Sequence, residues 1–219
     1  MKLAQFLMDI YERLYGTYGP QYWWPATTKF EIVLGAILTQ NTAWENVKRA
    51  LENLRGANCV TPLAIREISV ERLSLLIRPS GYFNSKAKKL KAFADYLALY
   101  NDEIGSWSTR DPKELRSELL KIYGIGPETA DDIVLYVAEL PSFVIDTYTR
   151  RIIGRLGIEP ISDTYDSYQS LFEDNLPHQS RLYNEYHALL DFHAKVTCMK
   201  RKPICTQCCL RDLCVTGKS

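Results

Sequence analysis

The sequence feature that most constrains the fold is a group of cysteines near the end of the chain. Five of the six cysteines lie within "TCMKRKPICTQCCLRDLC". Four of them have the spacing C-x6-C-x2-C-x5-C: Cys198, Cys205, Cys208 and Cys214. Four thiolates this close together can surround one metal centre, and such soft ligands select an iron–sulfur cluster or zinc. Zinc ribbons usually carry two C-x-x-C pairs and this segment has one, so the spacing favours a cluster over zinc. Cys59 and Cys209 are left over, and we expect them to be packing residues.

The composition is that of a soluble globular protein. Of the 219 residues, 46% are hydrophobic and 24% are charged, enough for one domain or two small ones. No apolar run is long enough to cross a membrane. Asp9, Glu12 and Arg13 interrupt the N-terminal stretch "MKLAQFLMDIYERLYG", which predicts an amphipathic helix rather than a signal peptide. We therefore expect a cytoplasmic protein with no membrane contact, in which disulfides are a poor alternative for the cysteines.

The net charge of +1 neither requires nor excludes a nucleic-acid partner, so the positions of the basic residues matter more. Basic side chains cluster in "KAKKLK", which begins at Lys86, and in "KVTCMKRK", which contains Lys200, Arg201 and Lys202. Each cluster is either a surface that contacts nucleic acid or an ordinary solvated face.

Apolar residues recur at helical spacing along most of the chain. In "KFEIVLGAILTQ", residues such as Val33, Leu34 and Ile37 follow the spacing of one buried helix face. The same pattern predicts further helices over residues 41–56, 70–77, 85–101, 111–123, 127–140 and 146–157. Alternating strands and repeats are missing from the pattern. The sequence therefore predicts an all-α fold with short loops.

A short glycine hairpin lies between two of these predicted helices, in "IYGIGPETAD". Gly124 and Gly126 permit a tight turn whose backbone N–H groups meet the start of the next helix. That arrangement can bind a phosphate without a charged side chain. The alternative is a helix–helix turn that needs glycine only for close packing.

Twenty residues after Gly126, the stretch "FVIDTYTRR" places Asp146 between an apolar run and a predicted helix. Aspartate is a favoured N-cap residue, and capping alone would explain this position.

Taken together, these motifs resemble the helix–hairpin–helix DNA glycosylases related to endonuclease III. "LGAILTQNT" and "GYFNSKAKKL" match two further stretches of that family, so the resemblance covers nearly the whole chain. It implies that the four cysteines hold a [4Fe–4S] cluster with no catalytic role. It also implies a helical barrel domain at residues 26–140, which contains the hairpin, and a discontinuous second lobe made of residues 1–25 plus 141–219.

One position departs from the pattern of the bifunctional members of this family. Those enzymes carry a lysine five residues into the hairpin motif, which attacks the sugar carbon, forms a Schiff base and cuts the strand. Glu128 stands at that position here. A carboxylate cannot form an imine, so the resemblance implies a monofunctional glycosylase without lyase activity.

The stretches "YWWPATTKFEIVLGAILTQNTAWENV" and "GIGPETADDIVLYV" most resemble the 3-methyladenine DNA glycosylase III and type II methylpurine glycosylase subgroup. An alkylated purine carries positive charge and a weakened glycosidic bond, so stacking and cation–π attraction can recognise it. Trp23 and Trp44 are candidates for the two faces of the base pocket, Trp24 and Pro25 for its wall, and Glu128 for a residue that shapes it. The alternative is that the tryptophans are core aromatics.

The resemblance also implies how duplex DNA containing a damaged base would be bound. Gln40 matches the residue that fills the space left by the flipped base, and the loop Tyr82–Phe83–Asn84 would wedge into the opposite strand. Asp146 would stabilise the oxocarbenium-like sugar and orient the attacking water. Phosphate contacts are assigned to the hairpin, to Gly124 and Gly126 in particular, and to Lys86, Lys200, Arg201 and Lys202.

Several other functions remain open from the sequence. The nearest alternative is a glycosylase that removes thymine or uracil opposite guanine, which shares the aspartate and often lacks the lysine. An adenine glycosylase acting opposite oxidised guanine would usually carry an extra C-terminal domain. Outside this class, the alternatives are a non-enzymatic DNA-binding or electron-transfer protein and a zinc-stabilised binding module. Enzymes of this type are usually monomers, and we expect a monomer.

Overall fold

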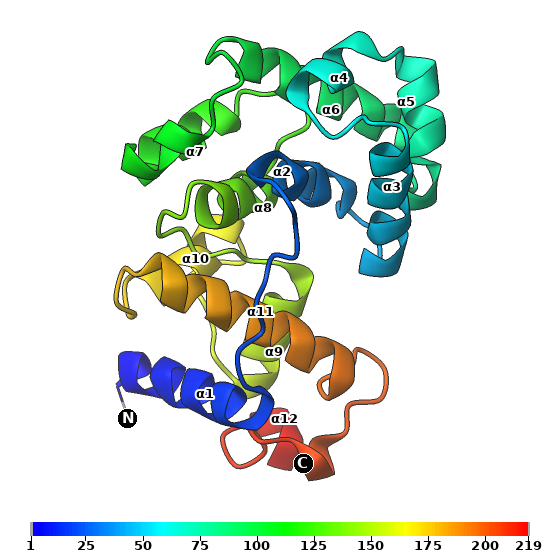
Figure 1. Cartoon of the computed structure of the whole chain (residues 1–219). Helices are drawn as coiled ribbons and strands as arrows, with labels where there is room; N and C mark the ends of the chain where they lie inside the picture. The colour runs from blue at the N-terminus through cyan, green and yellow to red at the C-terminus, as the bar shows by residue number, and fades with distance from the viewer. Residues whose placement is uncertain (1, 219) are drawn as a thin grey trace. The chain divides into compact units, whose positions relative to one another are not determined.

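The computed structural model describes residues 2–218, and in that range the chain forms α-helices and short helical turns without a β-strand (Figure 1). The prediction of an all-α fold is confirmed. Contacts divide the chain into two compact units, one made of residues up to Trp23 and from Pro141 onward, the other of Trp24–Leu140. No helix in the described range is both long and apolar enough to cross a membrane.

The continuous unit, Trp24–Leu140, holds most of the helices in the first two thirds of the chain. Its elements are α2 (Lys29–Leu38), α3 (Trp44–Gly56), α4 (Pro62–Glu67), α5 (Val70–Leu76), α6 (Phe83–Ala98), α7 (Pro112–Leu119) and α8 (Pro127–Asp132), with 3-10 turns at Arg78–Ser80 and Gly105–Thr109.

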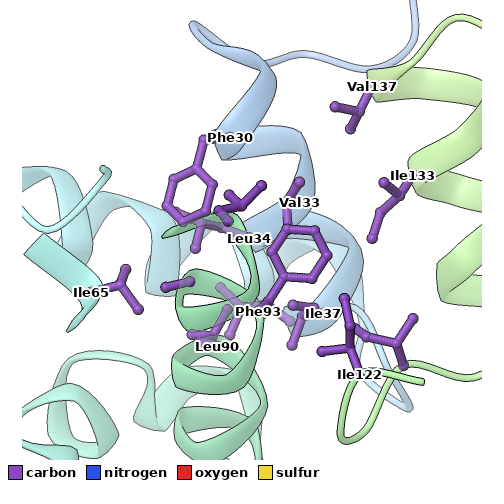
Figure 2. Packing of buried hydrophobic residues seen from close by; sticks show 14 of the residues in the cluster. Phe30, Val33, Leu34, Ile37, Ile65, Leu90, Phe93, Ile122, Ile133 and Val137 are labelled. Carbon is purple, nitrogen blue, oxygen red and sulfur yellow. The ribbon is translucent and has the colours of Figure 1, made fainter. Parts of the chain in front are cut away.

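The core of this unit forms around α2, as Figure 2 shows. The predicted face of Val33, Leu34 and Ile37 is fully buried, and it packs with Leu90 and Phe93 from α6. The same spacing that predicted the helix therefore delivers its apolar stripe to the core.

One predicted helix differs from the pattern. Residues 127–140 form α8 only as far as Asp132 and continue as a π-helical turn over Ile133–Val137. The wider turn is closed by Ala138 N–H, which donates to Ile133 O at 3.0 Å, five residues back. Such turns inside α-helices occur frequently at functional sites.

The discontinuous unit combines the first helix with the last third of the chain. Its elements are α1 (Leu3–Tyr18), α9 (Thr147–Leu156), α10 (Tyr165–Glu173), α11 (Ser180–Val196), a 3-10 turn at Cys205–Gln207 and α12 (Val215–Lys218). Leu7, Ile10 and Leu14 of α1 are fully buried, which confirms the predicted amphipathic helix. Tyr186 of α11 donates its hydroxyl hydrogen to Leu7 O at 2.8 Å, which ties α11 to α1.

The sequence analysis did not predict four helices, namely α4, α10, α11 and α12. The signal for α4 was present, because Thr61 caps the helix by accepting from Ala64 N–H and Pro62 occupies the first helical position. Thr164 caps α10 in the same way, by accepting from Ser167 N–H.

Candidate active site

Asp146 is the N-cap residue of α9, as the capping alternative predicted. Its Oδ1 accepts a hydrogen bond from Thr149 N–H at 2.6 Å. The preceding residues Phe143, Val144 and Ile145 are buried, so the chain leaves the core at Asp146 and starts the helix there. Capping therefore accounts for one carboxylate oxygen of Asp146.

The second oxygen of Asp146 faces a histidine. Oδ2 lies 3.8 Å from His187 Nε2 of α11, which is an ion-pair distance rather than a hydrogen bond, and the two side chains are 15% and 9% exposed. Burial acts to raise the pKa of Asp146, but the interaction with His187 and the hydrogen bond from Thr149 outweigh it, so the pKa lies below its usual range. The carboxylate is therefore ionised at neutral pH.

Sequence reasoning missed the polar side chains of α11 next to Asp146. His187 and Asp191 are four residues apart, so they share one face of the helix. Burial raises the pKa of Asp191, although Lys195 Nζ lies 2.6 Å from its Oδ2 and opposes that rise. A histidine and an aspartate at helical spacing in an otherwise apolar stretch were the signal that could have found them.

The glycine hairpin forms a turn between α7 and α8. Gly124 has φ of +81°, in the left-handed region that favours glycine, and Gly126 is the extended N-cap residue of α8. Glu128 lies in the first turn of α8 and its side chain is exposed.

Gln40 contacts the hairpin directly. It lies in the turn that follows α2, where its Nε2 donates to Gly124 O at 3.1 Å and to Thr129 Oγ1 at 2.9 Å. The structure thus brings together two motifs that the sequence separates by more than eighty residues.

The predicted wedge, Tyr82–Phe83–Asn84, is divided between solvent and core. Tyr82 is 73% exposed and has φ of +46°, an uncommon conformation for a bulky residue, and Asn84 is also exposed. Phe83 is half-buried and packs against the core of its unit. The start of α6 thus turns Phe83 inward, and insertion of this loop into the opposite strand stays a prediction.

The aromatic residues of the predicted base pocket fall in different units. Trp23 ends one segment of the discontinuous unit, whereas Trp24 and Trp44 belong to the other. Trp24 meets Trp44 edge to face at 5.5 Å between ring centroids and Tyr136 at 5.3 Å. A Cβ at Gly35 would lie 3.0 Å from Trp24 Nε1, so this glycine lets the indole lie against α2. Pro25 is exposed.

Lys86 does not lie on a DNA-contacting surface. Its side chain is 1% exposed, and its Nζ donates to Leu38 O at 2.7 Å, Thr42 Oγ1 at 2.8 Å and Ser80 O at 2.8 Å. Three acceptors use all three N–H groups of the ammonium. The prediction of a phosphate contact by Lys86 is wrong, because this side chain is enclosed between α2, the 3-10 turn and α6.

Two of the other lysines in that segment are also used internally. Lys91 Nζ donates to Arg66 O at 2.7 Å and to Ile68 O, and Lys89 Nζ donates to the side chain of Gln40. Lys88 is exposed. The basic segment in the sequence is therefore not a basic patch on the surface.

The second basic segment does reach solvent. Lys200, Arg201 and Lys202 are exposed. Arg155 of α9 holds the backbone of this loop, because its guanidinium donates to Met199 O and Lys200 O, both at 2.9 Å. Sequence reasoning missed Arg155, which follows Asp146 on the same helix.

The four cysteines of the predicted cluster line one pocket: Cys198, Cys205, Cys208 and Cys214. Arg155 Nη1 donates to Cys198 Sγ at 3.1 Å, Leu210 N–H donates to Cys208 Sγ at 3.4 Å, and His193 Nε2 lies 3.6 Å from Cys208 Sγ. All four are free thiols. As these side chains lie, no three His, Cys, Asp or Glu residues within 2–218 converge on one metal position. The donor set and the shared pocket fit a four-thiolate centre once the thiols turn toward a common point.

Comparison with known proteins places these features in context. Residues 34–178 match the model of the family described as HhH-GPD superfamily base excision DNA repair protein. A Methanocaldococcus jannaschii protein with the provisional name of DNA repair glycosylase is 42% identical over 214 residues, 97% of both chains.

Two solved structures are similar to all or most of the chain. One is a trapped endonuclease III–DNA covalent intermediate, with a TM-score of 0.85 and 23% identity over 100% of this chain and 98% of that one. The other is the 3-methyladenine DNA glycosylase of H. pylori bound to 1,N6-ethenoadenine, with a TM-score of 0.74 and 29% identity over 89% of this chain and 98% of that one.

Proposed function

The chain belongs to the HhH-GPD superfamily of base excision DNA repair proteins and is a DNA glycosylase. We propose that it releases alkylated purines from duplex DNA by hydrolysing the N-glycosidic bond. The observation that carries the proposal is the position of the Asp146 carboxylate. One oxygen caps α9, while the other lies 3.8 Å from His187 and is not held by a short hydrogen bond. A largely buried, ionised carboxylate with one oxygen available can act on a developing positive charge.

The chemistry assigned to Asp146 follows from the charge of the transition state. As the glycosidic bond stretches, positive charge grows on the sugar, and an anion in a poorly solvated position stabilises it more strongly than water does. The same oxygen can accept a proton from the attacking water. The products are the free base and an abasic site.

The substrate class rests on the aromatic residues and on similarity. Trp44 is half-buried and packs edge to face on Trp24, so we assign the stacking face of the pocket to Trp44, its support to Trp24 and its wall to Pro25. A cationic purine gains from stacking and cation–π attraction, and its weakened bond needs little acid help. The 29% identity to an H. pylori 3-methyladenine DNA glycosylase supports the same choice.

We assign no strand-cutting activity to the enzyme. Lyase chemistry in related enzymes needs an amine that attacks the sugar carbon, and Glu128 occupies the hairpin position where that amine would stand. Its exposed carboxylate on the first turn of α8 cannot form an imine. We retain Glu128 as a residue that shapes the pocket.

DNA contacts are assigned to groups that reach the surface. They are the hairpin at Gly124 and Gly126 and the loop Lys200, Arg201 and Lys202 for phosphates, Tyr82 and Asn84 for the opposite strand, and Gln40 for the vacated space. We propose that the enzyme acts as a monomer.

The four cysteines that share one pocket are proposed to hold a [4Fe–4S] cluster. When bound, the cluster would supply four iron–thiolate bonds that fix the loop carrying Lys200, Arg201 and Lys202. The chain's own contribution is to donate hydrogen bonds to sulfur from Arg155 and Leu210. Visible absorption at the blue end of the spectrum separates a cluster from zinc, which is colourless.

The proposal is tested by base release from a panel of duplexes. The panel contains 3-methyladenine, 7-methylguanine, thymine opposite guanine, uracil opposite guanine and thymine glycol, and released bases and strand nicks are measured separately. We expect release of the methylated purines without nicking. Excision of mismatched pyrimidines alone would identify the mismatch glycosylase, and thymine glycol release with nicking would contradict both the substrate and the monofunctional assignment.

A further inference from the structure

The side-chain amide of Gln40 is fully used within its own unit. Nε2 donates to Gly124 O and Thr129 Oγ1, at 3.1 and 2.9 Å, and Oε1 accepts from Lys89 Nζ at 2.5 Å. A lysine ammonium can only donate, so the oxygen of the amide must be the atom that faces Lys89. The orientation of Gln40 is thus fixed by three contacts from two parts of the chain, α6 and the hairpin with α8.

The glycine at the hairpin makes the Lys89 contact possible. A Cβ at Gly124 would lie 2.5 Å from Lys89 Cδ and 2.7 Å from Cε, and closer still to Cγ. The alkyl stem of Lys89 therefore passes directly over Gly124 on its way to Gln40. Gly124 is required both for its left-handed φ and for this close approach.

The turn that carries Gln40 is held on its other side by the buried lysine of the same helix. Lys86 Nζ donates to Leu38 O and to Thr42 Oγ1, the residues on either side of the turn. The turn itself is therefore anchored by Lys86, while the Gln40 side chain is anchored by Lys89. Loss of the Lys89 ammonium should free the side chain without unfolding the turn.

We propose that Lys89 is the positioning residue for Gln40, holding its amide against the hairpin until a DNA phosphate draws the ammonium away. The inference rests on the proposed function, because Gln40 matters only if it enters the duplex. A phosphate bound at the hairpin would approach the Lys89 stem, which already lies over Gly124. An ammonium is attracted more strongly by a phosphate anion than by a neutral amide oxygen. Phosphate binding at the hairpin thereby releases Gln40 for insertion.

The first test uses the protein without DNA. Lys89→Met keeps the alkyl stem over Gly124 and removes only the charge. Lys88→Met is the matched control, because it makes the same change at an exposed position next to Lys89 on α6. By NMR, hydrogen exchange of the Gln40 side-chain amide should rise roughly tenfold in Lys89→Met and stay unchanged in Lys88→Met. Equal exchange in wild type and Lys89→Met overturns the proposal.

The second test is a double-mutant cycle with Gln40→Ala, measured as the Kd for a duplex containing a tetrahydrofuran abasic site. The Kd of the Lys89→Met, Gln40→Ala double variant should differ by at least about threefold from the value expected if the two single effects multiplied. For Lys88→Met combined with Gln40→Ala, the effects on Kd should multiply. The salt dependence of log K should fall by about 1 in Lys89→Met, as expected for one lost phosphate contact.

Multiplicative effects, or a salt dependence that Lys89→Met leaves unchanged, overturn the proposal. A wild-type protein that does not prefer the abasic duplex over an undamaged one would instead count against the proposed function. In that case the amide exchange measurement still decides whether Lys89 positions Gln40.

Discussion

Two carboxylates in the two units occupy similar positions and have different surroundings. Glu31 lies in the first turn of α2, and Asp146 caps α9. Both side chains are largely buried and both have a lowered pKa. Both Glu31 oxygens accept strong hydrogen bonds, from Arg55 Nε at 2.9 Å and Nη2 at 3.1 Å and from Thr27 N at 2.8 Å and Oγ1 at 2.7 Å. Asp146 has one short hydrogen bond, and its other oxygen faces a histidine at 3.8 Å.

The difference separates a structural charge from one that is available for chemistry. A carboxylate whose acceptor positions are filled stabilises the fold and has little capacity left for a ligand. A carboxylate that is held on one side only keeps an oxygen for substrate. Burial and lowered pKa alone would not distinguish Glu31 from Asp146, whereas the hydrogen-bond partners of each oxygen do.

The largest expected effect is on the rate of base release. Asp146→Asn should lower the single-turnover rate by on the order of 10²–10⁴, because asparagine carries no charge to stabilise the sugar cation. Asparagine is as good an N-cap as aspartate, so α9 should stay intact. Rates are compared at saturating enzyme with melting curves as the check on folding.

Glu31→Gln is the matched control for that measurement. It makes the same carboxylate-to-amide change at the saturated position, and its rate per folded molecule should stay within about twofold of wild type. A comparable loss of rate in both variants would break the comparison between the two carboxylates.

The next effect is on stability, with the roles reversed. Glu31→Gln should lower the free energy of unfolding by about 1–3 kcal/mol, because it loses charge-assisted hydrogen bonds from Arg55 and Thr27 in a buried position. Urea unfolding of the two variants measures this directly. A larger loss in Asp146→Asn than in Glu31→Gln would reverse the assignment.

The loss of stability at low pH tests the structural role of Glu31 in a second way. Hydrogen bonding to Arg55, aided by Thr27, lowers the pKa of Glu31 from 4.5 to about 2. Because the folded pKa is depressed, the stabilisation is present above pH 4.5 and is lost as the pH falls toward about 2. Across that range the free energy of unfolding should depend less steeply on pH in Glu31→Gln than in wild type. An identical slope in the variant and wild type would contradict the account.

The smallest effect extends the comparison to the lysines. Replacing Lys200, Arg201 and Lys202 with alanine should lower the salt dependence of log K for DNA by up to about 2.7, with no change in the melting temperature. Lys86→Met should lower the melting temperature and leave the salt dependence unchanged, because the three acceptors of the Lys86 ammonium lie inside the protein. Filter binding from low to high salt and thermal melting of both variants distinguish the two outcomes.

The sequence was sufficient where local chemistry decides the structure. The helix spacing around Val33 and Ile37, the capping role of Asp146 and the left-handed turn at Gly124 all depend on neighbours within a few residues. These features were predicted because helix periodicity and glycine conformation are local properties.

The predicted phosphate contact of Lys86 was wrong because it relied on the charge of this residue and not on its position in the helical pattern. Positions 86, 90, 93 and 97 share one helix face, and Leu90, Phe93 and Leu97 on that face are buried. The same rule that predicted α6 therefore indicated that Lys86 would point inward. Its three acceptors could not be predicted, because they come from turns distant in sequence.

The partners of the functional side chains were beyond the sequence for the same reason. His187 lies forty-one residues after Asp146, and Lys89 meets Gln40 across forty-nine residues. Such contacts depend on how the helices pack. The motifs therefore identified the chemical groups, whereas the packing of the helices determines which of their atoms already have hydrogen-bond or ion-pair partners.

The most direct test of the central claim measures how the site discriminates charge. Wild type and Asp146→Asn are titrated with two duplexes that differ at one nucleotide, a cationic pyrrolidine abasic site and a neutral tetrahydrofuran one. If the Asp146 carboxylate faces the sugar cation, wild type should bind the pyrrolidine duplex on the order of 10² more tightly, and Asp146→Asn should bind the two about equally. An undiminished preference for the cation in Asp146→Asn would show that the carboxylate does no more than cap α9.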